Sequence, residues 1–230
     1  MERVLVVAAH PDDEVIGCGG TIAKHVQTGD IVSVLVLGDG VGSRGHASSE
    51  DALAARLDRE EEMRAAHEVL GVDCIHLDVA PDNQFDAVPM LEIAKEISEV
   101  VSHVVEPSII YTHHRGDLNI DHRITAEATL VAVRPMVSDK GGMPPREVYA
   151  YEVPESTAWA CRHDFRPSMY VSLPFEIFNR KLEAIQRYKN EMRDIPHPRS
   201  INNIASVVMA RGAECGSGYA EAFETIRCVR

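Results

Sequence analysis

A short apolar run near the N-terminus ends in a cluster of polar side chains, and this junction constrains the fold most strongly. Residues 4–8 read Val-Leu-Val-Val-Ala, and residues 9–14 read Ala-His-Pro-Asp-Asp-Glu. An apolar run of this length that ends near a proline is typical of a strand buried on both faces. In open α/β sheets, ligands bind just beyond the carboxyl ends of such strands. The sequence therefore predicts a central parallel strand with a polar site at its exit.

Short apolar segments alternate with amphipathic segments along most of the chain. We expect further strands at residues 31–37, 74–77, 108–112 and 147–151, and helices at residues 15–27, 50–70, 89–105 and 123–134. This alternation is typical of βαβ units. After residue 152 the pattern is less regular, with a strand near 169–173 and helices near 175–192 and 201–211. We predict an α/β fold with a mostly parallel sheet flanked by helices and an irregular C-terminal elaboration.

The composition narrows the classes of partner. The chain has 230 residues, which suits one large domain, and its formal net charge is −13. Such a charge repels polyanions and anionic membranes, so we expect neither nucleic acid nor a membrane surface as a partner. The five cysteines show no C-x-x-C spacing, which favours reduced thiols over a disulfide framework. The run at residues 4–8 is too short for a signal or membrane segment, so we expect a cytoplasmic protein.

Three residues could form a metal site at the end of the sheet. His10 and Asp13 can supply one nitrogen and one oxygen ligand to a divalent ion, and a second polar cluster at residues 113–122 ends in His122. In the usual strand order of such sheets, the first and fourth strands flank the point where the order reverses. Residues that follow these two strands would therefore converge on one crevice. Two nitrogens and one carboxylate form the ligand set of a catalytic zinc site, whereas a structural zinc more often has four ligands that include cysteine.

Asp12 lies beside these ligands without needing to be one of them. A bound metal lowers the pKa of its water towards about 7 and polarises a substrate carbonyl. A neighbouring carboxylate can take the proton of that water and later pass it to a leaving nitrogen. Asp12 is the candidate for this general base. Capping of the following helix is a second role that the same carboxylate could have.

These motifs resemble those of the LmbE-like/PIG-L family of zinc-dependent N-deacetylases. The resemblance rests on residues 9–14 (Ala-His-Pro-Asp-Asp-Glu), 17–21 (Gly-Cys-Gly-Gly-Thr) and 121–123 (Asp-His-Arg), and it extends over most of the chain, including residues 59–64 and 219–224. It implies a single deacetylase domain over residues 1–230, with a Rossmann-like fold, that removes acetyl groups from N-acetylglucosamine-type sugars. It also implies that His10, Asp13 and His122 bind Zn²⁺ and that Asp12 is the general base.

One position departs from the family pattern. Many members carry His-Pro-Asp-His where this chain has Asn119-Ile120-Asp121-His122, and the first of those histidines stabilises the oxyanion of the tetrahedral intermediate. An amide can still donate a hydrogen bond to an oxyanion, but it cannot add positive charge or exchange a proton. We therefore assign oxyanion binding to Asn119, and a nearby imidazole could supply what the amide lacks. The imidazoles considered are those of His113, His114 and His197.

Two arginines are further candidates for substrate contacts. Arg44 follows the second expected strand and Arg59 lies on the helix after it, at the ligand-facing end of the sheet. A guanidinium there could bind a hydroxyl, phosphate or carboxylate group, although a solvated surface arginine is the simpler interpretation at each position. His113, His114 and His197 are candidate substrate contacts as well. Asp121 is expected to orient an imidazole ligand.

We therefore predict a metal-dependent N-deacetylase, an amide hydrolase acting on an N-acetylated amino sugar or its conjugate. A dinucleotide-binding enzyme is a weaker interpretation, because Ile22 stands where G-x-G-x-x-G requires the third glycine. The same residues would also suit a non-catalytic or regulatory metal-binding protein, or a metal amidase for a different acyl group. The expected partner is a small N-acetylated sugar or conjugate. We also expect a homo-oligomer, since oligomers are common.

Overall fold

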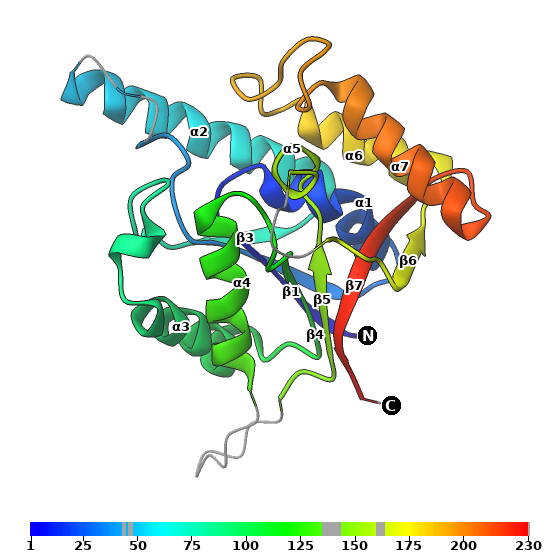
Figure 1. Cartoon of the computed structure of the whole chain (residues 1–230), viewed down its shortest axis with the longest axis horizontal. Coiled ribbons are helices and arrows are strands. Elements are labelled where there is room, and N and C mark those ends of the chain that lie inside the picture. The colour runs from blue at the N-terminus through cyan, green and yellow to red at the C-terminus, as the bar shows by residue number, and fades with distance from the viewer. Residues whose placement is uncertain (43–44, 46–47, 135–143, 160–163, 230) are drawn as a thin grey trace.

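The computed structural model describes residues 1–42, 45, 48–134, 144–159 and 164–229 (Figure 1). It contains a seven-stranded sheet in the order β3-β2-β1-β4-β5-β7-β6. The strands are β1 (Arg3–Ala8), β2 (Ile31–Val36), β3 (Asp73–His76), β4 (Ile109–His113), β5 (Glu147–Tyr151), β6 (Met169–Ser172) and β7 (Ala220–Cys228). Strands β1 to β5 are parallel, whereas β7 runs antiparallel to both β5 and β6. The mostly parallel α/β sheet that the sequence predicts is confirmed.

Helices cover both faces of this sheet (Figure 1). One face carries α1 (Asp13–Gln27), α2 (Ser49–Leu70), α6 (Phe175–Ile185) and α7 (Ile201–Cys215). The other carries α3 (Met90–Glu99) and α4 (Ile120–Val133), with a 3₁₀ turn at Phe85–Ala87 and a π-helical turn at Val100–Val105. A short helix, α5 (Pro154–Thr157), follows β5. No helix among the described residues combines the length and the apolar character that crossing a bilayer requires.

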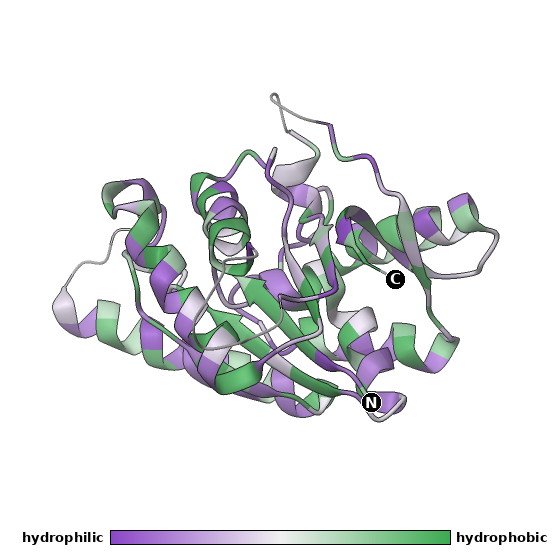
Figure 2. Ribbon diagram, turned by 90° about the horizontal axis from the view of Figure 1, so that it is seen from below, coloured by the Kyte–Doolittle hydropathy of each residue, from purple (hydrophilic) through white to green (hydrophobic). Residues whose placement is uncertain are grey.

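Strand β1 is buried on both faces. Its side chains and that of the following Ala9 alternate between two apolar clusters, with Val4, Val6 and Ala8 on the α1 side and Leu5, Val7 and Ala9 on the α4 side. Figure 2 shows the same concentration of hydrophobic residues in the strands of the sheet. A strand that buries both faces has no alternation of apolar and polar residues, which is why this run is continuously apolar.

The C-terminal part is more regular than the sequence indicates. It adds β6 and β7 to the sheet, and β7 pairs directly with β5. The pattern of β7 is hard to recognise because its first four residues are buried, whereas its last four are exposed. Helix α6 ends at Ile185, well before residue 192. Helix α4 begins at Ile120, three residues earlier than the sequence indicates, because Asn119 caps it.

A buried ion pair joins the C-terminal part to α1 where that helix is interrupted. Cys18 has non-helical torsion angles (φ −143°, ψ 23°). The Glu221 carboxylate of β7 accepts hydrogen bonds from the N–H groups of Gly20 (2.8 Å) and Thr21 (2.6 Å). Lys181 of α6 donates to the carbonyl of Ile16 (2.7 Å) and to Glu221 (2.5 Å). The pair therefore satisfies the backbone groups that the interruption leaves without helical partners.

The strand order reverses at β1 and β4. The chain leaves β1 to pair with β2 on one side and returns later as β4 on the other side. The loops after β1 and β4 therefore face each other at this end of the sheet. Such a reversal of strand order is where open α/β sheets bind their ligands.

Candidate metal centre

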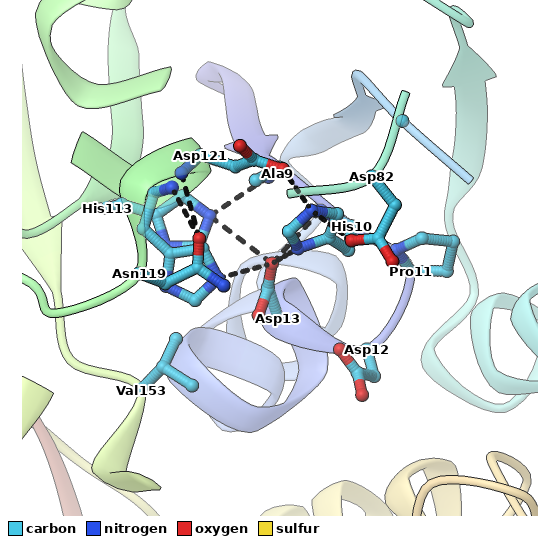
Figure 3. Close-up of polar contacts among 12 residues, drawn as sticks. Ala9, His10, Pro11, Asp12, Asp13, Asp82, His113, Asn119, Asp121 and Val153 are labelled. Carbon is cyan, nitrogen blue, oxygen red and sulfur yellow. Dashed lines mark hydrogen bonds and ion pairs between the residues drawn. The ribbon is translucent and has the colours of Figure 1, made fainter. Parts of the chain in front are cut away.

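The turn between β1 and α1 has an unusual backbone conformation. Asp12 has φ 111° and ψ −31°, a region that residues other than glycine rarely occupy. Its carbonyl accepts the first hydrogen bonds of α1, from Val15 N (3.1 Å) and Ile16 N (2.9 Å). In Figure 3, Asp13 points towards His10 and His113, whereas the carboxylate of Asp12 points away from them. The strained turn thus directs two neighbouring carboxylates to different places, and strain of this kind clusters at functional sites.

The turn is held from inside the molecule by Glu14. Its Oε1 accepts a hydrogen bond from Tyr188 Oη (2.7 Å) and lies 2.8 Å from His67 Nε2. Its Oε2 accepts one from the backbone N–H of Asp12 (3.1 Å). Glu14 is fully buried, so these contacts replace the water that its carboxylate loses. Glu14 therefore fixes the backbone of Asp12.

His10, Asp13 and His122 come together at this end of the sheet, from the turn after β1, the first residue of α1 and the first turn of α4. Asp13 Oδ2 lies 3.4 Å from His10 Nδ1 and 3.2 Å from His122 Nε2. Each of the three residues offers one ligand atom, and these atoms all lie within 4.8 Å of one another. All three residues are buried. The structure thus brings together the three ligands that the sequence predicts.

Each of the two imidazoles is held on its other nitrogen by a second carboxylate. His10 Nε2 lies 2.9 Å from Asp121 Oδ2 and 3.2 Å from Asp82 Oδ1. His122 Nδ1 lies 3.3 Å from Asp117 Oδ1. Imidazole ligands of metals almost always make such a contact, which fixes the orientation and tautomer of the ring. Both rings are therefore oriented with the nitrogen nearer Asp13 available for a metal.

A second group of potential ligands shares His10. His10, Asp82 and Asp121 also offer atoms within 4.8 Å of one another. The Asp121 carboxylate, however, already accepts hydrogen bonds from the backbone N–H groups of Asn83 (2.6 Å) and Phe85 (3.0 Å). These bonds suit an orienting carboxylate better than a ligand.

The electrostatics of the pocket favour a cation. Burial opposes protonation of His10, but the carboxylates of Asp121 and Asp13 outweigh it and raise its pKa to about 9. Burial likewise opposes protonation of His122, and Asp13 and Asp117 raise its pKa to about 10. The pocket therefore stabilises positive charge between these rings. A divalent ion could take the place of the protons, because metal binding displaces them from its ligands.

Two buried polar atoms of the cluster support this interpretation. Asp13 Oδ1 is inaccessible to solvent and has no hydrogen-bond partner within the described part of the chain, and buried His122 Nε2 has only the ion-pair contact with Asp13 Oδ2 (3.2 Å), without hydrogen-bond geometry. A buried polar group without a partner is costly, and such groups need an explanation. A metal ion held by His10, Asp13 and His122 would satisfy both atoms. The residues present therefore fit a divalent metal site.

Asp12 has a separate environment. Its Oδ2 lies 3.0 Å from Arg199 in the segment between α6 and α7. The same guanidinium contacts Glu155 of α5 and Glu191, each at 2.5 Å. Burial raises the pKa of Asp12 to about 6, and the Arg199 guanidinium opposes part of that rise. A carboxylate with a pKa in this range can accept and release a proton near neutral pH.

The side chain of Asn119 is largely committed to the fold. Its Oδ1 accepts hydrogen bonds from Asp121 N (2.8 Å) and His122 N (3.5 Å), which caps α4. Its Nδ2 lies 3.4 Å from Asn83 Oδ1, at the long end of hydrogen-bond distances. The Nδ2 group is therefore the part of Asn119 that remains to donate to a substrate oxygen.

The three imidazoles that could supplement Asn119 have other partners. His113 stacks on His122, with ring centroids 4.1 Å apart, and its Nε2 accepts a hydrogen bond from Ala9 N (2.9 Å). Burial lowers the pKa of His113 well below its usual value, so this ring is neutral. His114 Nδ1 lies 3.1 Å from Glu224, and the exposed His197 accepts a hydrogen bond from Arg199 N. None of these contacts places a cationic imidazole beside Asn119.

Of the two arginines predicted to contact substrate, the structure describes only Arg59. Arg44 lies outside the described residues. Arg59 is only 3% exposed, so it is not a solvated surface residue. It donates to the carbonyl of Pro11 (3.0 Å) and pairs with Glu191. The Arg59 guanidinium therefore packs against the turn that carries Asp12 and holds its backbone through the Pro11 carbonyl.

The sequence alone predicts no role for Asp117, for Glu191 or for the ion pair of Arg199. Asp117 belongs to the polar cluster that ends in His122, so a signal for it existed in the sequence. Arg199 and Glu191 approach Asp12 from a segment far along the chain. No spacing in the sequence links these residues to residue 12.

Fold and site together define an α/β protein with a buried His₂Asp cluster that fits a metal ion, and with an adjacent carboxylate, at the carboxyl ends of its central strands. Residues 5–133 match the sequence model of the PIG-L family, described as GlcNAc-PI de-N-acetylase. The match spans more than half of the chain, and the chain therefore belongs to the PIG-L family.

Three further proteins show what the chain is similar to. The "Uncharacterized deacetylase YaiS" of Escherichia coli is 27% identical over 192 residues, which cover 81% of this chain and 90% of that protein. The 4-oxalmesaconate hydratase of Pseudomonas putida is 30% identical over 203 residues, covering 80% and 72%. The solved structure of N,N′-diacetylchitobiose deacetylase from Pyrococcus horikoshii has a TM-score of 0.77 at 23% identity, over 98% of this chain and 84% of that one. The last comparison supports the fold.

Proposed function

We propose that this protein hydrolyses the acetamide group of an N-acetylated amino sugar or its conjugate. The observation that carries the proposal is the buried cluster of His10, Asp13 and His122 beside Asp12, a carboxylate directed away from the cluster. Membership of a family described by a de-N-acetylase activity supports the choice of an acetamide. YaiS and the solved structure from Pyrococcus horikoshii are both named deacetylases, which further supports the proposal.

We propose Zn²⁺ as the cofactor, held by His10, Asp13 and His122. Two imidazoles and one carboxylate are a common ligand set of catalytic zinc. When bound, the ion would lower the pKa of a water molecule and polarise the acetamide carbonyl. Asp121 and Asp117 would keep the two imidazoles in their ligating orientation.

Asp12 would act as both base and acid. Its carboxylate accepts a proton from the attacking water as the oxygen–carbon bond forms, and the protonated carboxyl then donates that proton to the departing nitrogen as the carbon–nitrogen bond breaks. The products are acetate and a free amine. Asn119 Nδ2 is available to donate a hydrogen bond to the carbonyl oxygen as it gains negative charge. The ion pair with Arg199 holds the Asp12 carboxylate in place for both proton transfers.

Acetate release from a panel of N-acetylated sugars and sugar conjugates tests the proposal. We expect the zinc-loaded protein to release acetate and a free amine in equal amounts from at least one compound. Loss of the activity on chelation and its return on adding zinc would tie it to the metal. If zinc-loaded protein releases no acetate from N-acetylglucosamine, its oligosaccharides or its conjugates, the proposal is wrong.

A hydratase is the second candidate, because a protein that is 30% identical is named 4-oxalmesaconate hydratase. A carboxylate base beside a metal could equally assist addition of water to a carbon–carbon double bond. The charges near Asp12 argue against a polycarboxylate substrate, since Arg199 and Arg59 already pair with Asp12, Glu155 and Glu191. Hydration of an unsaturated oxo-acid removes its conjugated double bond, so the loss of ultraviolet absorbance would detect this activity.

We also propose that the protein acts in the cytoplasm. The described cysteines Cys18, Cys74, Cys215 and Cys228 are all free thiols, which supports a reducing compartment.

A further inference from the structure

A groove of about 560 Å³ lies between α2 and β3, the strand at one edge of the sheet. Met63 and His67 of α2 and Cys74 of β3 line this groove. Met63 and His67 are four residues apart, so they lie on the same side of the helix. The groove therefore collects a thioether, an imidazole and a thiol from two elements of the fold.

The two sulfur atoms in this groove are spaced as ligands of one metal ion would be. Cys74 Sγ lies 3.8 Å from Met63 Sδ, to which the thiol donates a weak hydrogen bond. Metal–sulfur bonds of about 2.3 Å, at trigonal or tetrahedral angles, separate two sulfur ligands by about 3.8–4.0 Å. The spacing of this pair therefore fits a shared ion.

His67 has one ring nitrogen bound and the other without a partner. Its Nε2 lies 2.8 Å from Oε1 of Glu14, and the carboxylate of Glu14 also accepts hydrogen bonds from Tyr188 Oη and from the N–H of Asp12. A carboxylate that only accepts requires a proton on His67 Nε2, which leaves the lone pair of the neutral ring on Nδ1. His67 is only 3% exposed, and its Nδ1 has no hydrogen-bond partner among the residues that the structure describes.

This state of His67 is the one that a metal ligand requires. Imidazole ligands almost always donate their second N–H to a carboxylate, a carbonyl or a water molecule, and Glu14 takes this place for His67. A buried nitrogen without a partner is costly, and an ion bound to Nδ1 would remove that cost. His67 therefore adds a third ligand atom to the sulfur pair.

The ligand atoms and the charges of the groove determine the class of ion. Thiolate and thioether sulfur are soft ligands that favour Cu(I), whereas Mg²⁺ and Ca²⁺ prefer oxygen. Glu60, Glu68 and Asp73 line the groove with Arg64, so carboxylates outnumber guanidinium groups among its described lining residues. Such a wall attracts a cation. Burial raises the pKa of the Cys74 thiol to about 12, so this thiol is not a nucleophile near neutral pH.

We propose that Met63, His67 and Cys74 form a second metal site, which binds one Cu(I) ion through Sδ, Nδ1 and Sγ. As the metal–sulfur bond to Cys74 forms, the thiol proton is released to solvent, and neither the metal nor the sulfur changes its oxidation state. This site shares no ligand with the cluster around Asp13. The inference therefore stands or falls independently of the deacetylase.

Competition with a chelator tests the site. Zinc-loaded protein, kept anaerobic and reduced, is titrated with Cu(I) in the presence of bathocuproine disulfonate, whose Cu(I) complex is coloured. We expect one bound Cu(I) ion, which Met63→Leu and His67→Gln each bind at least about tenfold more weakly and Cys74→Ser loses. The exposed Cys215 provides the matched control, because Cys215→Ser should bind Cu(I) as wild type does. Met63→Leu conserves the volume of a buried side chain, so this variant should remain folded.

Three results would overturn the proposal. Cu(I) binding that survives in all three groove variants, or that Cys215→Ser abolishes, would mean that surface thiols hold the ion. Release of zinc in place of binding a second ion would mean that Cu(I) enters the cluster around Asp13. X-ray absorption at the copper edge needs no variant, and we expect nitrogen and sulfur ligands together. A spectrum with sulfur ligands alone would exclude His67.

Discussion

The metal cluster and the surroundings of Asp12 are built in different ways. The cluster lies where the chain passes from β1 into α1 and in the first turn of α4, is buried, and has each imidazole oriented by a carboxylate. The surroundings of Asp12 come from segments after β5 and α6. There Arg199, with a side chain 21% exposed, joins three carboxylates from different parts of the chain.

This difference separates two properties of the protein. Under the proposed function, metal binding would depend on residues that the parallel sheet itself brings together. Turnover and substrate choice would depend also on the C-terminal segments that cover the sheet. Changes in those segments should therefore alter catalysis while leaving the metal in place.

The largest effect is expected from the shared ligand. Asp13→Ala removes the carboxylate that faces both His10 and His122. We expect loss of bound metal and a fall in activity of at least about 10³-fold, since metal charge stabilisation contributes several kcal/mol. Metal analysis with acetate release measures both. An active, zinc-loaded Asp13→Ala protein would refute the ligand assignment.

Breaking the buried Lys181–Glu221 pair tests how strongly the C-terminal part is joined to α1. Lys181→Met leaves the Glu221 carboxylate buried without its cation. We expect the free energy of unfolding to fall by about 3–5 kcal/mol, as measured by denaturant titration. The exposed pair Arg187–Glu183 provides the control, because Arg187→Met should cost about 1 kcal/mol or less. Equal losses in the two variants would contradict the joining role of Lys181.

The orienting carboxylates should have an intermediate effect on metal affinity. Asp121→Asn and Asp117→Asn weaken the contacts that hold His10 and His122. We expect each to weaken zinc affinity about 10- to 100-fold, as measured by competition with a chelator. Unchanged affinity in both variants would show that the rings are held by packing alone.

A smaller effect is expected from Arg199. Burial raises the pKa of Asp12 to about 6 and Arg199 lowers it, so Arg199→Met should raise this pKa further. The base is then protonated over a wider acidic range, and the acid limb of the kcat/KM profile moves to higher pH. Arg199→Lys retains the charge and should shift the limb less. Both variants should bind zinc as wild type does. Loss of zinc from either one would contradict the claim that metal binding is independent of the residues around Asp12.

The sequence contained the information for the cluster but not for the surroundings of Asp12. His10 and Asp13 follow a recognisable buried strand, and the rule for strand order brings His122 to them. Asn119 was harder to assign, because its cap of α4 depends on where that helix begins. Arg199, Glu191 and Glu155 meet Asp12 through the packing of segments that have no periodic pattern. Their contacts depend on tertiary structure that local spacing does not encode.

The division between metal binding and proton transfer is tested most directly at Asp12. The measurement is zinc content and acetate release for Asp12→Asn and wild type, side by side on the same sugar. We predict that the variant retains as much zinc as wild type while kcat falls by about 10²–10⁴-fold, the range for loss of a general base. Loss of zinc from Asp12→Asn would make Asp12 a ligand, and retained turnover would exclude it as the base. Either result would contradict the central claim.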